Sequence, residues 1–366
     1  MYLEIEKSRL IKPLALATSV VEKRQTLPIL SNLFLSLEDG ALTITGTDLE
    51  VEVSFRIGNI KGEDGTCTVM ARKLYEICRA LPDDALIKFR VDGKGAHIQS
   101  GRSRFKLQTL PADDFPRLDT KDWEERLKVS ERELKGLFES TAFSMAQQDV
   151  RYFLNGVLLE IRDDAVRAVA TDGHRLAKSE TSLGSGKYAF RQVIVPRKAV
   201  LEMLRFLEDE DRELTLELNP NHIRLHTDAS TLTTKLIDGR FPDYETVMAR
   251  ALSVSLIVDR PELTDVLNRT AILTNEKFRG IRIHLASNLL TVTAHNPDQE
   301  EASDEIPVEY DGAELDIGFN VNYLLDALKA VPSSLVQLRL QDSNSGCIIK
   351  EPEDDDTLYL VMPMRL

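Results

Sequence analysis

Residues 155–172 read NGVLLEIRDDAVRAVATD, and this stretch decides the fold because the chain repeats its pattern twice more. Apolar residues alternate over two short runs, and the polar turn Arg162-Asp163-Asp164 separates the runs. Alternation with a period of two predicts half-buried strands, and two such runs around a short turn predict a β-hairpin.

The same pattern recurs at residues 32–48, NLFLSLEDGALTITGTD, and at residues 280–296, GIRIHLASNLLTVTAHN. The three stretches lie about 124 residues apart, and each is followed by a second shared element that leads into an apolar helical stripe. These second elements are residues 70–73, 195–198 and 319–322. Self-similarity at a fixed period indicates repeated structural units, so the sequence predicts three similar domains.

Apolar stripes with helical spacing predict two helices in each repeat. The six expected helices are residues 8–24, 71–80, 131–152, 196–206, 260–279 and 320–330. Together with about two dozen short strands they predict an α+β fold of repeated domains, each with two helices packed on antiparallel sheets. Polar or proline-rich stretches between the repeats place the domains at residues 1–124, 125–252 and 253–366.

Composition excludes several classes of protein. The chain has 366 residues, a formal charge of −14 and three widely spaced cysteines without metal-binding spacing. These features favour reduced thiols and two or three domains. No segment approaches the roughly 18 apolar residues of a membrane span, and the N-terminus does not resemble a signal peptide, so we expect a cytoplasmic protein.

The acidic total argues against a simple DNA-binding domain, but the charge is unevenly distributed. The six expected helices carry +7, which leaves −21 on the rest of the chain. A surface of basic helices would attract phosphates, while the acidic remainder would discourage stray binding. The competing explanation is that lysine and arginine are simply good helix formers.

Asp172 and His174 are the residues that most resemble a catalytic pair. No nucleophile elbow, second carboxylate or metal-spaced histidine accompanies them, and they occupy a turn position that recurs in all three repeats. We therefore expect a turn and no enzyme, metal or cofactor. Two alternatives remain: a structural or storage-type repeat protein that binds peptides but no DNA, and a hydrolase that uses this pair.

Eight stretches together resemble the β subunit family of bacterial DNA polymerase III, the DNA sliding clamps, from one end of the chain to the other. They are residues 25–32, 46–50, 100–105, 148–152, 170–176, 238–244, 275–280 and 361–366. The resemblance implies three similar domains per subunit, and a ring of two head-to-tail subunits around duplex DNA. It also implies a loader that uses ATP to open the ring, no catalysis by the clamp, and a hydrophobic pocket for short motifs of replicative and translesion polymerases and other partners.

The resemblance also implies three sets of functional residues. The DNA-binding set is Arg24, Gln148, Tyr152, Arg197, Lys198, Arg205 and Arg240. The partner-peptide pocket is Arg151, Leu154, Thr171, Gly173, His174, Arg175, Leu176, Pro242, Val247, Asn320, Tyr323, Leu360, Met362, Pro363, Met364, Arg365 and Leu366. The dimer interface is Lys73, Ile77, Leu81, Arg102, Arg104, Phe105 and Leu107 of one subunit against Ile272, Leu273, Gln299, Glu300, Glu301, Asp304 and Glu305 of the other.

Two positions at the lip of the implied pocket depart from the family pattern. Asn344 and Gly346 stand where the family often has valine and serine. The fine peptide preference of the pocket therefore does not follow from the resemblance.

Overall fold

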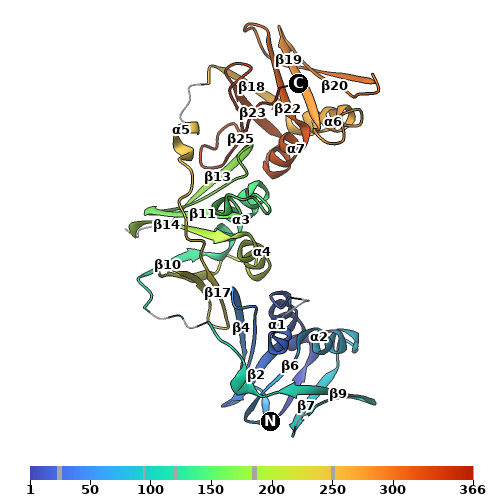
Figure 1. Cartoon of the computed structure of the whole chain (residues 1–366), viewed down its shortest axis with the longest axis vertical. Helices are drawn as coiled ribbons and strands as arrows, with labels where there is room; N and C mark the ends of the chain where they lie inside the picture. Colours follow the sequence, from blue (N-terminus) through green and yellow to red (C-terminus); the bar gives the residue numbers. More distant parts are fainter. Residues whose placement is uncertain are drawn as a thin grey trace. The chain divides into compact units, whose positions relative to one another are not determined.

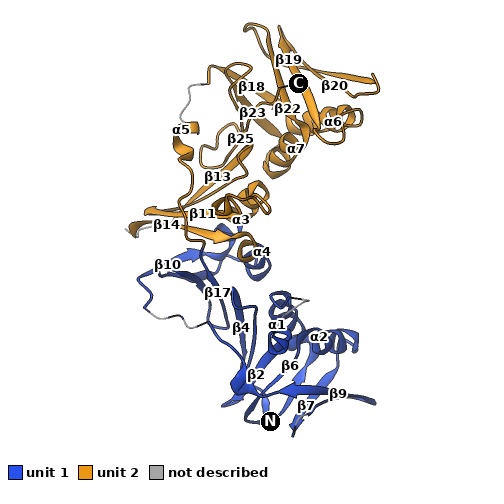
Figure 2. Cartoon of the chain, in the orientation of Figure 1, with its two compact units in different colours: residues 1–135, 201–236 blue, residues 136–200, 237–366 orange. Residues whose placement is uncertain are grey.

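A computed structural model describes residues 1–22, 27–93, 95–118, 120, 122–183, 188–248 and 252–365. The chain divides into two compact units (Figure 2). Unit 1 comprises residues 1–135 and 201–236, and unit 2 comprises residues 136–200 and 237–366.

Seven α-helices occur in the described residues (Figure 1). They are α1 (Lys7–Ser19), α2 (Ala71–Ala80), α3 (Glu131–Thr141), α4 (Arg197–Phe206), α5 (Tyr244–Met248), α6 (Arg260–Ala271) and α7 (Val321–Ala330). Four short 3-10 helices are η1 (Pro28–Ser31), η2 (Ala112–Asp114), η3 (Ala142–Ser144) and η4 (Tyr152–Leu154). In unit 1, α1 and α2 lie side by side.

Unit 1 contains one antiparallel sheet of thirteen described strands. In spatial order they are β10 (Glu125–Ser130), β15 (Glu213–Leu218), β16 (His222–His226), β17 (Ser230–Lys235), β4 (Val51–Ile57), β3 (Ala41–Thr47), β2 (Asn32–Glu38), β6 (Gly65–Met70), β9 (Ser103–Leu110), β8 (Gly95–Ser100), β7 (Leu86–Asp92), β1 (Tyr2–Glu6) and β5 (Lys61–Glu63).

Unit 2 contains two sheets in its described part. The first runs β14 (Tyr188–Pro196), β11 (Gly156–Asp163), β12 (Ala165–Thr171), β13 (Arg175–Ser182), β25 (Leu358–Val361), β24 (Cys347–Lys350), β23 (Leu335–Leu340) and β18 (Val254–Asp259). The second runs β21 (Glu301–Pro307), β20 (Leu289–His295), β19 (Gly280–Ala286) and β22 (Leu315–Asn320). The predicted α+β fold with antiparallel sheets is confirmed.

The three predicted hairpins are present as β2–β3, β11–β12 and β19–β20. In the first turn, Asp39 and Gly40 both have positive φ, 50° and 70°. This backbone form matches the twist of the flanking strands, and aspartate followed by glycine adopts it readily. Asp163 and Asn288 supply the left-handed residue of the other two turns.

Three expected helices are shorter than the sequence suggested, and α5 was missed. α1 ends at Ser19, before the β-branched pair Val20-Val21, and α3 ends where the hydroxyls of Ser140 and Thr141 bond back to carbonyls one turn earlier. α6 ends at Ala271, and the Asn275 side chain then forms its own turn with the amides of residues 277 and 278. The spacing of apolar residues alone therefore overestimated the lengths of these helices.

Helices and sheets bury the three cysteines in apolar surroundings. Cys67 and Cys78 belong to the core of unit 1, and Cys347 to a core of unit 2. All three are free thiols, and burial raises the pKa of each to about 12. Because the thiolate is the reactive form, these residues are inert at neutral pH.

Sheets of different repeats join edge to edge inside each unit. In unit 1, β4 pairs with β17, and Val53 lies opposite Leu232. In unit 2, β13 pairs with β25, and Ala177 lies opposite Tyr359. Each join satisfies the backbone groups of two edge strands and continues one sheet into the next repeat.

The segment that leaves the first repeat is fixed to β4, the strand through which that repeat forms the join in unit 1. Arg117 donates two hydrogen bonds to the buried carboxylate of Glu52, at 3.0 and 3.1 Å, and the amide of Leu118 donates a third at 3.1 Å. Phe115 packs on Phe34 with ring centroids 5.5 Å apart. A buried carboxylate with this many donors is well compensated, so loss of either partner would be costly.

Glu52→Ala is therefore expected to lower the free energy of unfolding of the chain by about 2 kcal/mol, because Arg117 and the Leu118 amide lose their acceptor. Chemical denaturation followed by circular dichroism measures this change. The matched control is Glu50→Ala, which removes an exposed ion pair with Lys235 and should cost about 0.5 kcal/mol or less. Equal effects of the two substitutions would contradict the assignment.

Candidate functional site

The turn at residues 171–176 is built by side-chain hydrogen bonds to the backbone. The Asp172 carboxylate accepts from the amides of His174 and Arg175, at 2.9 and 3.0 Å. Asp48 in the first repeat accepts in the same way from residues 50 and 51, and Asn296 in the third from residues 298 and 300. The prediction that Asp172 serves a turn is confirmed, and His174 stacks on Tyr323.

The carboxyl-terminal segment is held at this turn by its backbone. The amide of Met362 donates to the carbonyl of His174 at 2.9 Å, and the amide of Met364 donates to the carbonyl of Gly318 at 2.8 Å. The side chains of Met362, Pro363 and Met364 are half-buried. Backbone fixation places these apolar side chains at the surface of unit 2 without requiring them to fill its core.

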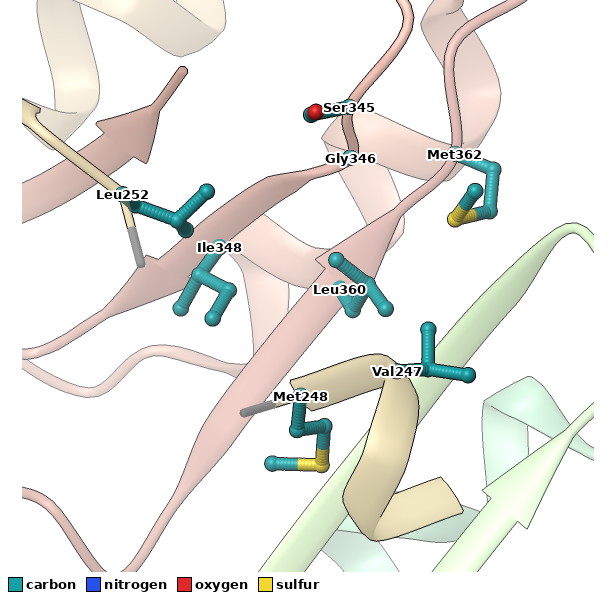
Figure 3. A pocket seen from close by; sticks show the side chains of 8 residues that line it. All are labelled: Val247, Met248, Leu252, Ser345, Gly346, Ile348, Leu360 and Met362. Atoms are coloured by element: carbon teal, nitrogen blue, oxygen red, sulfur yellow. The ribbon is translucent and has the colours of Figure 1, made fainter. Parts of the chain in front are cut away.

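An apolar cavity lies beside this segment, between the end of α5 and the loop before β24 (Figure 3). It encloses about 280 Å³ of empty space, part of it open to solvent. Its walls are Val247, Met248, Leu252, Ser345, Gly346, Ile348, Leu360 and Met362. Methionine side chains adapt their shape readily, so these walls suit a leucine or phenylalanine from another chain.

A second, polar cavity in the same unit is larger, with about 940 Å³ of partly open space. Its walls are Phe143, Met145, Ala146, Gln147, Gln148, Asp149, Asp172, His174, Arg175, Arg197 and Tyr323. Exposed charges and hydrogen-bonding groups of this kind suit the polar backbone and flanking residues of a peptide.

Arg175 is the central charge of the polar cavity. Its guanidinium lies 4.7 Å from the ring centre of Tyr323 and 5.4 Å from that of Phe143. It also contacts Asp326 at 2.5 Å and Asp172 at 3.1 Å. Planar stacking and several hydrogen bonds fix this side chain, so the cavity wall is preorganised.

Arg151 and Asp149 form the outer rim of the polar cavity. The guanidinium of Arg151 and its amide both donate to Asp149, which lowers the pKa of Asp149 to about 2. Gly173 has a φ of +88°, and a Cβ there would lie 3.1 Å from the Arg151 guanidinium. Glycine at 173 thus permits both the left-handed turn and the approach of Arg151.

Six residues of the predicted peptide pocket line these two cavities. Val247, Leu360 and Met362 line the apolar one, whereas His174, Arg175 and Tyr323 line the polar one. The remaining described residues take supporting or rim positions: Leu154, Leu176 and Thr171 are buried, Asn320 caps α7, Arg151 and Gly173 form the rim, and Pro242, Pro363, Met364 and Arg365 are exposed or half-buried. Leu366 lies outside the described residues.

Four residues of the apolar cavity were missed by the sequence reasoning. They are Met248, Leu252, Ser345 and Ile348. Ile348 was detectable, because it follows Cys347 in a short apolar run. The approach of α5 to that strand depends on tertiary packing and leaves no local signal.

The described residues that were predicted to contact DNA fall in both units. Gln148 and Arg197 line the polar cavity, and Tyr152 lies against Gly239, next to the exposed Arg240. Lys198 follows Arg197 on α4, and Arg205, which belongs to unit 1, pairs with Glu202. Arg24 lies outside the described residues.

The residues predicted for the dimer interface fall into two groups. In unit 1, Leu81 and Leu107 belong to the core, Ile77 and Phe105 are half-buried, and Lys73, Arg102 and Arg104 are exposed. In unit 2, Ile272 is 76% exposed and Leu273 is half-buried. Gln299, Glu300, Glu301 and Glu305 are exposed, and Asp304 pairs with Arg269 at 2.6 Å.

None of the helices in the described residues is both long and apolar enough to cross a lipid bilayer. Among the same residues, no group of three or more histidine, cysteine, aspartate or glutamate side chains could hold a metal ion.

Comparison with known proteins covers the whole chain. Models of the N-terminal, central and C-terminal domains of the DNA polymerase III beta subunit match residues 1–119, 128–243 and 246–365. The beta sliding clamp of Pseudomonas aeruginosa is 48% identical over 370 residues, and that of Escherichia coli is 45% identical over 369. Each comparison covers 100% of both chains.

Solved structures show the same similarity. A sliding clamp of P. aeruginosa bound to griselimycin has a TM-score of 0.98 at 48% identity, with full coverage of both chains. The Caulobacter crescentus beta sliding clamp, with polyethylene glycol bound to its putative beta-motif tethering region, has a TM-score of 0.94 at 37% identity. That comparison covers 100% of this chain and 99% of the other.

The repeated fold and the full-length matches define a DNA sliding clamp, a processivity factor that catalyses no reaction itself. The chain belongs to the DNA polymerase III beta subunit family. The hydrolase alternative is therefore wrong, in agreement with the turn role of Asp172.

Gly346 sets the shape of the apolar cavity. A Cβ at this position would lie 2.5 Å from the Cδ1 atom of Leu360 and 3.2 Å from the sulfur of Met362. Gly346→Val is therefore expected to push Leu360 into the cavity and to weaken binding of a leucine- and phenylalanine-bearing peptide about tenfold. Fluorescence anisotropy measures the affinity. The control is Asn344→Val, an exposed neighbour, which should change it less than about twofold.

Proposed function

We propose that two copies of this chain close head to tail into a ring around duplex DNA, and that a clamp loader places the ring there. Replicative and translesion DNA polymerases, and other proteins with clamp-binding motifs, would dock in the two cavities of unit 2. In this proposal the domains are residues 1–124, 125–252 and 253–366, and the ring acts in the cytoplasm without a cofactor. The three family matches support the threefold division.

The observation that carries the ring is the pair of internal sheet joins. β4 meets β17, and β13 meets β25, each time joining the last strand of one hairpin sheet to the next repeat. In the third repeat the corresponding strand, β21, pairs only with β20 among the described strands. In the first repeat, residues 103–107 of β9 have a described partner on one side only. Two such free edges are complementary ends of a head-to-tail assembly.

The internal joins also supply a register for this seam. Leu232 opposite Val53 and Tyr359 opposite Ala177 are all nearly or fully buried. The equivalent positions in the free edges are Phe105 and Ala302, which are only half-buried. We propose the same register for the seam, with Phe105 opposite Ala302 of the partner subunit.

One step along the same register, Lys106 lies opposite Glu301 of the partner subunit. Arg102 and Arg104 flank Lys106, and Glu300 and Glu305 flank Glu301, so a basic edge would meet an acidic one. Opposite charges directly across an antiparallel pair are favourable and help to select the register.

Helix ends support the same assignment. At the first join, Ser19 near the end of α1 hydrogen-bonds Glu202 of α4 at 2.5 Å. At the second, Phe143 after α3 packs on Tyr359, with ring centroids 5.6 Å apart. The residue at the equivalent position after α6 is Ile272, whose exposed side chain would find its contact on α2 of the partner subunit.

The helices supply a modest attraction for DNA. With the bounds of the structure, α1 to α4, α6 and α7 carry fourteen basic and eight acidic residues, a net charge of +6, within a chain of −14. Lys7 is buried against the carbonyl of Leu81 and Asp83, and Arg205 pairs with Glu202. Because these pairings neutralise part of the positive charge of the helices, we expect the helices to contact DNA weakly and without sequence preference, which permits sliding.

Replacing Ile272 and Leu273 together with alanine should give folded monomers at about 1 µM, because the seam loses its most exposed apolar contact. Analytical ultracentrifugation measures the association. Phe190→Ala removes an equally large exposed apolar side chain outside the proposed seam and should leave the dimer intact. A double variant that stays wholly dimeric would place the seam elsewhere.

A loaded ring should remain on circular DNA and leave the same DNA once it is linearised, because topology and not ionic contact retains it. Arg240→Ala should lower the salt slope of binding to short linear duplex by about one unit. Its retention on circles should match that of wild type and of the control Arg282→Ala, an exposed arginine outside the proposed DNA set. Rapid loss of the closed variant from intact circles would contradict encirclement.

A further inference from the structure

The two internal joins differ in the side chains on one face of the sheet, which is the face that carries the apolar cavity in unit 2. Across the second join, Leu176, Leu360 and Ile348 lie side by side on neighbouring strands. The equivalent row across the first join is Glu52, Thr233 and Arg224. The same place in the fold is therefore apolar in unit 2 and polar in unit 1.

The linkers that follow the two hairpin sheets also take different courses. Residues 115–118 read FPRL, and residues 241–244 read FPDY. In unit 1, Arg117 and Leu118 of the first linker bind Glu52, the first residue of the polar row. In unit 2, the residue equivalent to Leu118 is Tyr244, whose hydroxyl bonds to Glu160 of β11 and Arg167 of β12 rather than to the strand β13 that forms the join.

Tyr244 is fixed there by a buried polar network. Its hydroxyl donates to Glu160 of β11, whose side chain is fully buried, and accepts from Arg167 of β12 at 2.8 Å. Arg167 also contacts Glu180 at 2.5 Å and Glu245 at 3.1 Å. A hydroxyl held between a carboxylate and a guanidinium makes two charge-assisted hydrogen bonds, the strong kind.

The network acts on the cavity through α5. Tyr244 begins this one-turn helix, and Val247 and Met248 at its end form one wall of the apolar cavity. Asp243 fixes the turn by accepting from the amide and the hydroxyl of Thr246, at 3.3 and 2.7 Å. Since so short a helix has little stability of its own, its position depends on Tyr244.

We propose that Tyr244 is a positioning residue for partner binding: held by Glu160 and Arg167, it draws the second linker onto β11 and β12 and so positions the Val247–Met248 wall of the apolar cavity opposite Leu360 and Ile348. This inference rests on the proposed role of the cavity as a peptide site.

The test compares Tyr244→Phe with Tyr310→Phe in the full-length dimer. Tyr310 also donates its hydroxyl to a protein acceptor, the carbonyl of Ala313, but outside the two cavities. The probe is a fluorescein-labelled peptide with one leucine and one phenylalanine anchor. We expect Tyr244→Phe to weaken binding about tenfold, since a displaced wall must be repositioned at the expense of affinity. Tyr310→Phe should change affinity less than about twofold, and neither variant should change the dimer or its retention on circular DNA.

The second measurement is hydrogen exchange, which separates a local change at α5 from a general loss of stability. Hydrogen exchange of the amides of residues 246–248 should become at least about tenfold faster in Tyr244→Phe, while the amides of β11 and β12 stay protected. In the wild-type dimer, addition of the peptide should leave these three amides nearly unchanged, because the wall is already in place. Unaltered exchange and affinity in Tyr244→Phe would overturn the proposal, as would strong new protection of α5 on peptide binding to wild type.

A wrong assignment of the cavity as a peptide site would give a different result. If the site is misassigned, wild type will bind the labelled peptide no better than a copy with both anchors replaced by alanine, and Met362→Ala will have no effect. The exchange of α5 in Tyr244→Phe still decides whether the network positions the wall, since that readout requires no ligand.

Discussion

An edge strand of a β-sheet presents a row of unpaired N–H and C=O groups, and the whole architecture depends on how those rows are satisfied. Inside each unit, strands of successive repeats pair across β4–β17 and β13–β25, so the sheets continue through the repeats. The helices, the core residues and both cavities take their positions from these ladders. At the two ends of the series of repeats, residues 103–107 of β9 and the strand β21 each have a described partner strand on one side only.

The continuous backbone pairing fixes the positions of the strands. It leaves the outward-facing side chains free to differ from one repeat to the next. Glu52 and Leu176 occupy equivalent positions, yet one accepts three hydrogen bonds from a linker and the other belongs to the apolar core that includes Ile348 and Leu360. A buried carboxylate satisfied by its own linker needs no partner, whereas an apolar cavity favours one. Duplication of one domain can thus give identical joins with distinct functions.

The sequence was sufficient for the fold because its strongest signals are local and repeated. Alternating hairpins such as residues 32–48 and the turn residues Asp39-Gly40 specify antiparallel strands wherever they occur. Helix ends were less predictable, since α6 stops where Asn275 offers the backbone another set of hydrogen bonds. Val247, Leu360 and Met362 in the lining of the apolar cavity followed from the family resemblance. Met248 and Leu252 did not, because their contact with Ile348 depends on a linker whose course is set by the distant Glu160.

Burial of the three native cysteines has a practical value for following such a ring in motion. With thiol pKa values raised to about 12, Cys67, Cys78 and Cys347 present almost no thiolate to a maleimide dye at neutral pH. A single cysteine introduced at an exposed position would therefore take the label selectively in an otherwise native chain. The same property allows a disulfide to be engineered between neighbouring edge strands without interference from the native thiols.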